Sequence, residues 1–318
     1  MRKRAIIVSL LVVAAAIAGC FEKKEEFTLN PDGSGKVVFE SIMSMPMMQM
    51  GDQKPDLSAE ARKMAKTILD GSEGVEVWGD IACGTTEDGR ARFKGTAYFK
   101  DLAKLKIAQS NDKTSFAKDP KGGMVLTLEM GGDEEGGRKE PKPATPAAPP
   151  TEEEITAQIQ QARAAYTMQK AMMAPILAKM KVETSFRLPG TLAETSGFQK
   201  TPDGCVRMMV DGAAMMKAMD EVMADDAILR QAILAGEDVS KGPQGELITE
   251  KLFGKGPMKA RVTGDLKPLF DFAAESQAAK AAYPEAVKKL GLDKAEGPVM
   301  PPMPPMPPGA PAPPKIGG

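Results

Sequence analysis

The stretch Arg90-Ala-Arg-Phe-Lys-Gly-Thr-Ala-Tyr-Phe99 alternates between two kinds of side chain. One set is small or apolar and the other is charged or polar: Ala91, Phe93, Gly95, Ala97 and Phe99 against Arg90, Arg92, Lys94, Thr96 and Tyr98. Successive side chains of a strand point to opposite faces, so this pattern predicts a strand with one face on a core and one in water. A sheet that is solvated on one face is typical of antiparallel architecture.

The segments around this strand contain further strand and turn signals. Glu26–Asn30 and Lys36–Glu40 flank a Pro-Asp-Gly turn and predict a β-hairpin. A second hairpin is expected within 114–130, around the turn Asp119-Pro-Lys-Gly-Gly123. Other expected strands start at Val75 or cover 182–188, 205–210 and 258–262.

Apolar residues at helical spacing predict several helices between these strands. The longest runs from about Thr151 to Met180, with Glu152 to Glu154 favouring its positive N-terminal end. Shorter helices are expected in 56–69, 213–235 and 268–290. The predicted fold class is α+β: an antiparallel sheet of hairpins with packed helices and one long helix in the middle of the chain.

The first twenty residues carry an export signal. Arg2, Lys3 and Arg4 precede an apolar run from Ala5 to Ala18, which is shorter than the roughly 20 residues that span a bilayer. The sequence Ile17-Ala18-Gly19-Cys20 then resembles the bacterial lipobox, whose cysteine carries diacylglycerol. We therefore predict a lipoprotein signal peptide at 1–19, lipidation of Cys20 and a short tether at 20–23.

The predicted signal places the protein in the cell envelope, lipid-anchored to a membrane and facing the periplasm or the exterior. Phe21 follows Cys20, where Asp in a double-membrane bacterium resembles an inner-membrane retention signal. The outer membrane is therefore favoured if the organism has one.

Composition divides the rest of the chain. Residues 24–292 hold the expected α+β body, while 131–151 is rich in Gly, Glu, Lys, Pro and Ala and predicts a flexible linker or insert. One composite body and two domains split at this segment are both compatible with the pattern. Residues 293–318 form a Pro/Met-rich tail that is expected to be disordered.

Several short motifs are similar to those of a family of uncharacterised bacterial lipoproteins, and more loosely to LppM-type lipoproteins. They are Asn30-Pro-Asp-Gly-Ser-Gly-Lys36, Gly74-Val-Glu-Val-Trp-Gly-Asp80, Lys94-Gly-Thr-Ala-Tyr-Phe-Lys-Asp101, Leu188-Pro-Gly190 and Phe270-Asp-Phe272. The resemblance implies a lipoprotein with an α+β fold. It implies no reaction and no site residues.

Composition also limits the chemistry. The chain has no histidine, which excludes Ser-His-Asp and Cys-His catalysis and HExxH-type zinc sites. Its 42 Lys and Arg nearly balance its 43 Asp and Glu, so charge gives no reason to expect a nucleic-acid partner. We find no catalytic constellation and expect neither an enzyme nor a cofactor.

Two groups of sulfur-containing side chains are candidates for sites. Cys83 and Cys205 are the thiols that remain besides Cys20, and export favours a disulfide between them, with two separate free thiols as the alternative. Five methionines cluster around Pro46, and thioethers select Cu(I). They are Met43, Met45, Met47, Met48 and Met50. An apolar cover is the alternative interpretation of this cluster.

The sequence therefore favours a membrane-anchored, extracytoplasmic binding or structural module without enzymatic activity. Its expected partners are the membrane, through the N-terminal lipid, and an unidentified envelope protein or ligand. The alternative hypothesis is an extracytoplasmic Cu(I)-binding protein that uses the methionine cluster.

Overall fold

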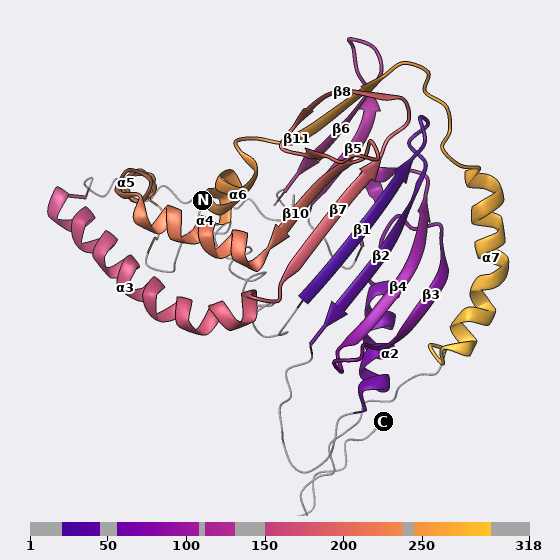
Figure 1. Cartoon of the computed structure of the whole chain (residues 1–318), viewed down its shortest axis with the longest axis horizontal. Helices are drawn as coiled ribbons and strands as arrows, with labels where there is room; N and C mark the ends of the chain where they lie inside the picture. The colour runs from indigo at the N-terminus through magenta and orange to yellow at the C-terminus, as the bar shows by residue number, and fades with distance from the viewer. Residues whose placement is uncertain are drawn as a thin grey trace, which may run out of the picture.

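The computed structural model describes residues 21–44, 56–107, 112–130, 150–236, 239 and 245–293. These residues form an α+β fold with largely antiparallel sheets and a long helix in the middle of the chain, which confirms the predicted fold class (Figure 1). Three predicted features lie outside the described residues: the signal peptide 1–19 with Cys20, most of the linker (131–149) and nearly all of the tail (294–318).

A seven-stranded sheet forms the centre of the molecule. Its spatial order is β3 (Val77–Thr85), β4 (Ala91–Phe99), β2 (Gly35–Met43), β1 (Phe21–Leu29), β7 (Lys181–Arg187), β10 (Val206–Asp211) and β9 (Gln199–Lys200). The pairs in this sheet are antiparallel except β1 with β7, which is parallel. Strands from both sides of the 131–149 segment therefore belong to one sheet.

A second, four-stranded sheet packs on one face of the first. It has the order β5 (Lys113–Lys118), β6 (Met124–Glu129), β11 (Met258–Thr263) and β8 (Thr191–Ser196). Apolar side chains of both sheets share one core, in which Phe186 stacks on Phe27 at 4.7 Å between ring centroids and meets Phe198 edge-on at 5.8 Å. Sequence patterning predicted most of the strands, but not β8 or β9 and not the division into two sheets.

Helix α2 (Leu57–Asp70) covers the remainder of this core face. The Asp56 side chain accepts hydrogen bonds from the backbone N–H groups of Ser58 and Ala59 and caps the helix. The buried stripe of α2 packs against β3 and β4, next to a 3₁₀ turn, η1 (Leu102–Lys104). The stripe consists of Ala61, Met64, Ala65 and Ile68.

Four helices form a second hydrophobic cluster beside the sheet. They are α3 (Glu152–Leu177), α4 (Gly212–Ala224), α5 (Asp226–Leu234) and α6 (Gly245–Phe253). A reciprocal capping box between Thr151 and Glu154 starts α3. We call these four helices the helical lobe; α3 leads into β7, and β10 leads into α4.

The last helix, α7 (Phe272–Lys289), lies along β3 on the side of the sheet away from the second sheet. Its Ala279 packs in a small cluster with Val77 and Tyr98. Helix α7 covers part of the polar face predicted for β4. Tyr98 is only 6% exposed beneath this helix, whereas Arg92 and Lys94 on the same face are exposed.

The N-terminal tether predicted at 20–23 is wrong for residues 21–23. Strand β1 begins at Phe21, which pairs with Met43 of β2, and Glu22 pairs with Lys181 of β7. Pairing on both sides extends the strand beyond the segment that its own apolar residues predict, because backbone hydrogen bonds do not depend on side-chain type.

No helix within the described residues is long and apolar enough to cross a bilayer.

Candidate functional site

The face of the seven-stranded sheet opposite the core is polar and partly open. Strand alternation places the even-numbered residues of β1 and β2, and the odd-numbered residues of β7 and β10, on this face. Glu26 lies beside Ser185, and Thr28 beside Arg187. We call this surface the open face.

A groove of about 410 Å³ lies on the open face. Strands β1, β2 and β7 form its floor, and the turn before β10 and the segment before α7 contribute its walls. The lining residues are Glu26, Phe27, Thr28, Lys36, Val38, Ser185, Arg187, Asp203, Cys205, Leu269 and Phe270. The lining combines two cationic side chains, two carboxylates and an apolar wall.

Asn30 fixes the apolar wall in place. This residue is 3% exposed in the turn between β1 and β2, and its side-chain oxygen accepts a hydrogen bond of 2.9 Å from the backbone N–H of Leu269. Its amide nitrogen donates to the carbonyl oxygen of Phe270 at 3.3 Å. The wall is thus held by a residue far away in sequence, and Leu269 remains 42% exposed above the floor.

Lys36 is the cation at the foot of this wall. Its Nζ lies 4.5 Å from the centroid of the Phe270 ring and 2.7 Å from Oε2 of Glu275 in α7. Tyr98 donates to the same carboxylate oxygen at 3.1 Å. Burial, together with this hydrogen bond, raises the pKa of Tyr98 to about 12, so its hydroxyl stays a donor at neutral pH.

The opposite wall is the tight turn Thr201–Cys205. Hydrogen bonds from Thr201 and from the Cys205 thiol (3.2 Å) lower the pKa of Asp203, and Arg187 approaches its carboxylate at 3.4 Å. Burial and the neighbouring Asp203 raise the pKa of Cys205. A thiol must ionise to act as a nucleophile, so this pair favours a structural or binding role over nucleophilic catalysis.

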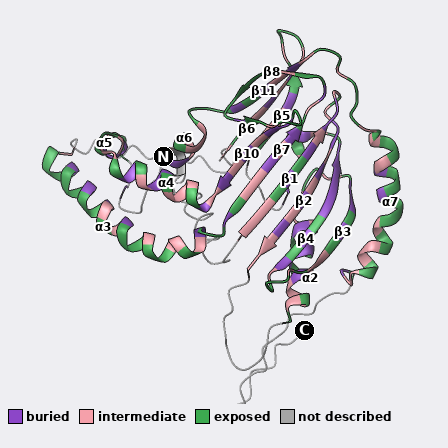
Figure 2. Ribbon diagram, viewed as in Figure 1, coloured by how far each residue is buried: buried purple, intermediate pink, exposed green. Residues whose placement is uncertain are grey.

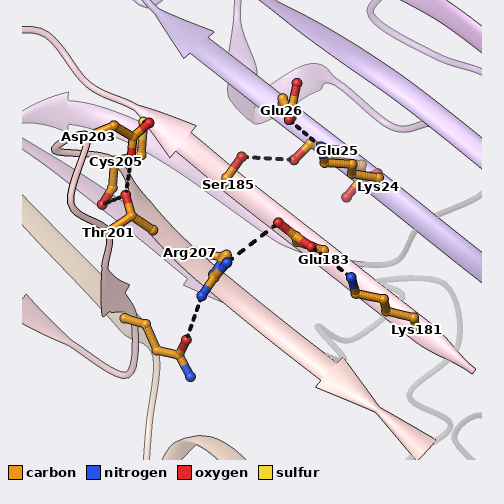
Figure 3. A network of polar contacts seen from close by, with 11 residues as sticks. Lys24, Glu25, Glu26, Lys181, Glu183, Ser185, Thr201, Asp203, Cys205 and Arg207 are labelled. Atoms are coloured by element: carbon orange, nitrogen blue, oxygen red, sulfur yellow. Dashed lines mark hydrogen bonds and ion pairs between the residues drawn. The ribbon is translucent and has the colours of Figure 1, made fainter.

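A smaller hollow of about 190 Å³ lies on the sheet further towards the start of β1. Here Lys24 and Glu26 are 2.7 Å apart, and Glu183 lies between Lys181 at 3.5 Å and Arg207 at 3.8 Å (Figure 3). Charges of opposite sign alternate along these strands. The open face is therefore hydrophilic, but it has no strong net charge of either sign.

A buried polar group lies on the core face of the same strands. Glu25 is 7% exposed, accepts a 2.9 Å hydrogen bond from Thr184 and lies 3.2 Å from Nζ of Lys23. Burial lowers the pKa of Lys23, but attraction to Glu25 and Asp112 more than compensates, so this pKa is raised. The charges are mutually satisfied, as buried ionic groups usually are.

The predicted disulfide between Cys83 and Cys205 is wrong in this structure, where both are free thiols. Cys83 lies on the edge strand β3, and Cys205 directly precedes β10 in the same sheet. Strands β4, β2, β1 and β7 lie between these two strands. At about 4.8 Å per strand the separation is roughly 24 Å, far beyond the reach of a disulfide.

Of the other predicted site residues, the structure describes only Met43. It ends β2 and packs against the main core, as the apolar-cover interpretation expects. Cys20 and the methionines at 45, 47, 48 and 50 lie outside the described residues. Among the residues that are described, no three His, Cys, Asp or Glu side chains are grouped to hold a metal ion.

Sequence reasoning missed the groove. Its two cations and its aromatic wall come from the start of β2, the end of β7 and the segment before α7. The available signal is the Asn30-Pro-Asp-Gly33 turn, whose pattern predicts a hairpin but does not show that Asn30 also holds the wall.

The chain matches no protein-family description, and no curated protein sequence matches it. Among solved structures, it is similar to the folded domain of LppM from Mycobacterium tuberculosis, determined by NMR. The identity is 12% over 78% of this chain and 92% of that domain, with a TM-score of 0.28. A likeness at this level establishes neither a shared family nor a shared function.

Proposed function

We propose that this protein is a lipid-anchored, extracytoplasmic binding module without enzymatic activity. The lipobox-like sequence at Ile17–Cys20 supports the anchor, and the folded body starting at Phe21 is left whole by cleavage before Cys20. The groove on the open face is the observation that carries the binding role. Its location on a rigid sheet is typical of a preformed site.

The lining of the groove suits a small amphipathic molecule with an acidic group. Leu269 and Phe270 offer apolar surface, while Lys36 and Arg187 can pair with an anion. Arg187 is the more available cation, because its side chain is 59% exposed and its contact with Asp203 is long at 3.4 Å. A ligand carboxylate can replace Asp203 as the partner of Arg187. Asp203 is itself 58% exposed, so its charge would then be hydrated and not left buried and unpaired.

The first prediction concerns the anchor. Cys20→Ser should abolish lipid attachment and move the protein from the membrane fraction to an unprocessed or soluble form, because acyl chains supply the proposed membrane affinity. Cell fractionation with mass spectrometry of the N-terminus measures this. Cys83→Ser is the control and should stay in the membrane fraction. A processed Cys20→Ser protein that remains membrane-bound would refute the anchor.

The second prediction concerns the groove. Decanoate should bind the lipidated protein in vesicles, and decyltrimethylammonium of the same chain length should not. Arg187→Ala should weaken decanoate binding by about tenfold, the equivalent of a hydrogen bond to a charged group. Calorimetric titration, corrected for partition of each ligand into protein-free vesicles, measures both.

Arg92→Ala is the matched control for the groove. Arg92 is also on the open face and also pairs with a carboxylate, Glu40 at 2.6 Å, but it lies outside the groove lining. Its removal should leave decanoate binding unchanged. Equal binding of both decyl compounds, or equal losses in the two Arg variants, would contradict the proposed site.

A further inference from the structure

The outward side of α3 carries an apolar stripe that the helical lobe does not cover. The buried residues Ile155, Ile159 and Tyr166 define the inward side of the helix. On the opposite side lie Ala164, Met168, Ala171, Met172 and Pro175, all exposed, at the four- and three-residue spacing of one helix face. Met168 and Met172 are 76% and 74% exposed, and they are the two most exposed large apolar side chains among the described residues.

The same end of the molecule carries the start of the chain's folded body. Lys181, the first residue of β7, is the cross-strand partner of Glu22 in β1. Only three residues separate Lys181 from Leu177, the last residue of α3. Met172 lies a further five residues back, or about 8 Å along the helix at 1.5 Å per residue.

The proposed lipid attachment lies next to this surface. Cys20 precedes the first residue of β1 by one peptide bond, so its Cα lies about 3.8 Å from that of Phe21. No linker separates the acyl chains from the sheet, so this end of the body must stay at the bilayer. Figure 1 shows α3 on the same side of the molecule as the start of β1, with α4 on its inner side.

We propose that the α3 stripe, together with the end of the sheet at Phe21, rests on the lipid bilayer to which Cys20 is anchored; this inference builds on the anchor proposed above. Flexible methionines adapt to an irregular apolar medium, and the exposed Lys179 at the end of the stripe can reach the headgroups. Figure 2 shows α3 as a largely exposed helix with buried residues only at intervals. The contact fixes the orientation of the body, with the second sheet and the groove held away from the anchor.

The test uses the lipidated protein in phosphatidylcholine–phosphatidylglycerol vesicles, with an environment-sensitive fluorophore at Met172→Cys. Lys121→Cys, an exposed position in the turn between β5 and β6, is the reference at the other end of the body. Quenching by 5-doxyl phosphatidylcholine should be at least about twofold stronger at position 172, since interfacial helices bury their apolar face by about 5–10 Å. Protein without either change sets the background from the half-buried Cys83 and the buried Cys205.

A second pair of variants removes the apolar side chains without touching the core. Met168→Gln with Met172→Gln should reduce quenching of a fluorophore at Ala164→Cys, the exposed stripe position furthest from the anchored end, to the level at Lys121→Cys. If the protein floats with the vesicles but quenching is equally low at 172 and 121, the docking is refuted and the anchor stands. If Cys20 carries no lipid and the protein does not float, the anchor is refuted and the docking with it.

Discussion

Replacement of Phe186 by Ala is expected to lower the free energy of unfolding by about 3–5 kcal/mol. Phe186 is 1% exposed and lies on β7, where it stacks on Phe27 of β1 and meets Phe198 edge-on. Truncation would leave a void between the two sheets and remove the aromatic contact between strands from the two halves of the chain. Offset and edge-on aromatic pairs add to the burial term, which places this site at the upper end of core truncations.

Chemical denaturation followed by the fluorescence of Trp78, the single tryptophan, measures this loss. Phe272→Ala is the matched control, because Phe272 is only partly buried on the other side of the sheet, 6.5 Å from Tyr98 between ring centroids. Phe272→Ala should lower the free energy of unfolding by less than half as much as Phe186→Ala. Equal losses in the two variants would contradict the assignment of Phe186 to the shared core.

Replacement of Gly212 by Ala is expected to destabilise the protein by about 3 kcal/mol or more. Gly212 is buried at the start of α4, and its backbone N–H donates to the carbonyl oxygen of Met180 at 3.0 Å. A Cβ at this position would overlap the carbonyl group of Leu177, which is backbone and cannot rotate away. The substitution therefore forces apart the two connections through which the helical lobe joins the sheet.

Gly84→Ala provides the comparison, since a Cβ there meets no atom within 4 Å. Its free energy of unfolding should stay within about 0.5 kcal/mol of that of the unchanged protein. Thermal unfolding by circular dichroism should show the Gly212 loss in the helical signal. A Gly212→Ala protein as stable as Gly84→Ala would mean that this junction is looser than the structure shows.

Local patterns predicted much of the fold. The alternation over 90–99 and the turns after Asn30 and Asp119 are signals within a few residues. Strands β4, β1, β2, β5 and β6 form around them, with β1 starting earlier than predicted. The long helix also follows from local apolar periodicity and from the acidic residues at its start. Strand β8 (Thr191–Ser196) was missed because its mostly exposed residues lack an alternating apolar pattern.

Long-range features had no such signal. The parallel pairing of β1 with β7 depends on the backbone and on Phe27 meeting Phe186, and neither segment specifies its partner. Export to an oxidising compartment favours a disulfide between Cys83 and Cys205, but it carries no information on the four strands between β3 and β10. The groove had no local signal either. Its wall exists only because Leu269 and Phe270, far away in the sequence, pack beside Asn30 and Lys36.

The parallel pair in the middle of the sheet also has a consequence for the order of folding. Strands β1 to β4 come from the first hundred residues and form two hairpins, β1 with β2 and β3 with β4, joined by the β2–β4 pair. One edge of β1 stays unpaired until β7 arrives from beyond the 131–149 segment. Closure between such distant segments is slow, since loop entropy is lost before the contacts form. A chain that is synthesised from its N-terminus therefore cannot complete its central sheet until β7 has been made. Under the export proposed above, this delay favours an unfolded chain during passage through the membrane. The unpaired edge of β1 is then the part that a chaperone would need to shield.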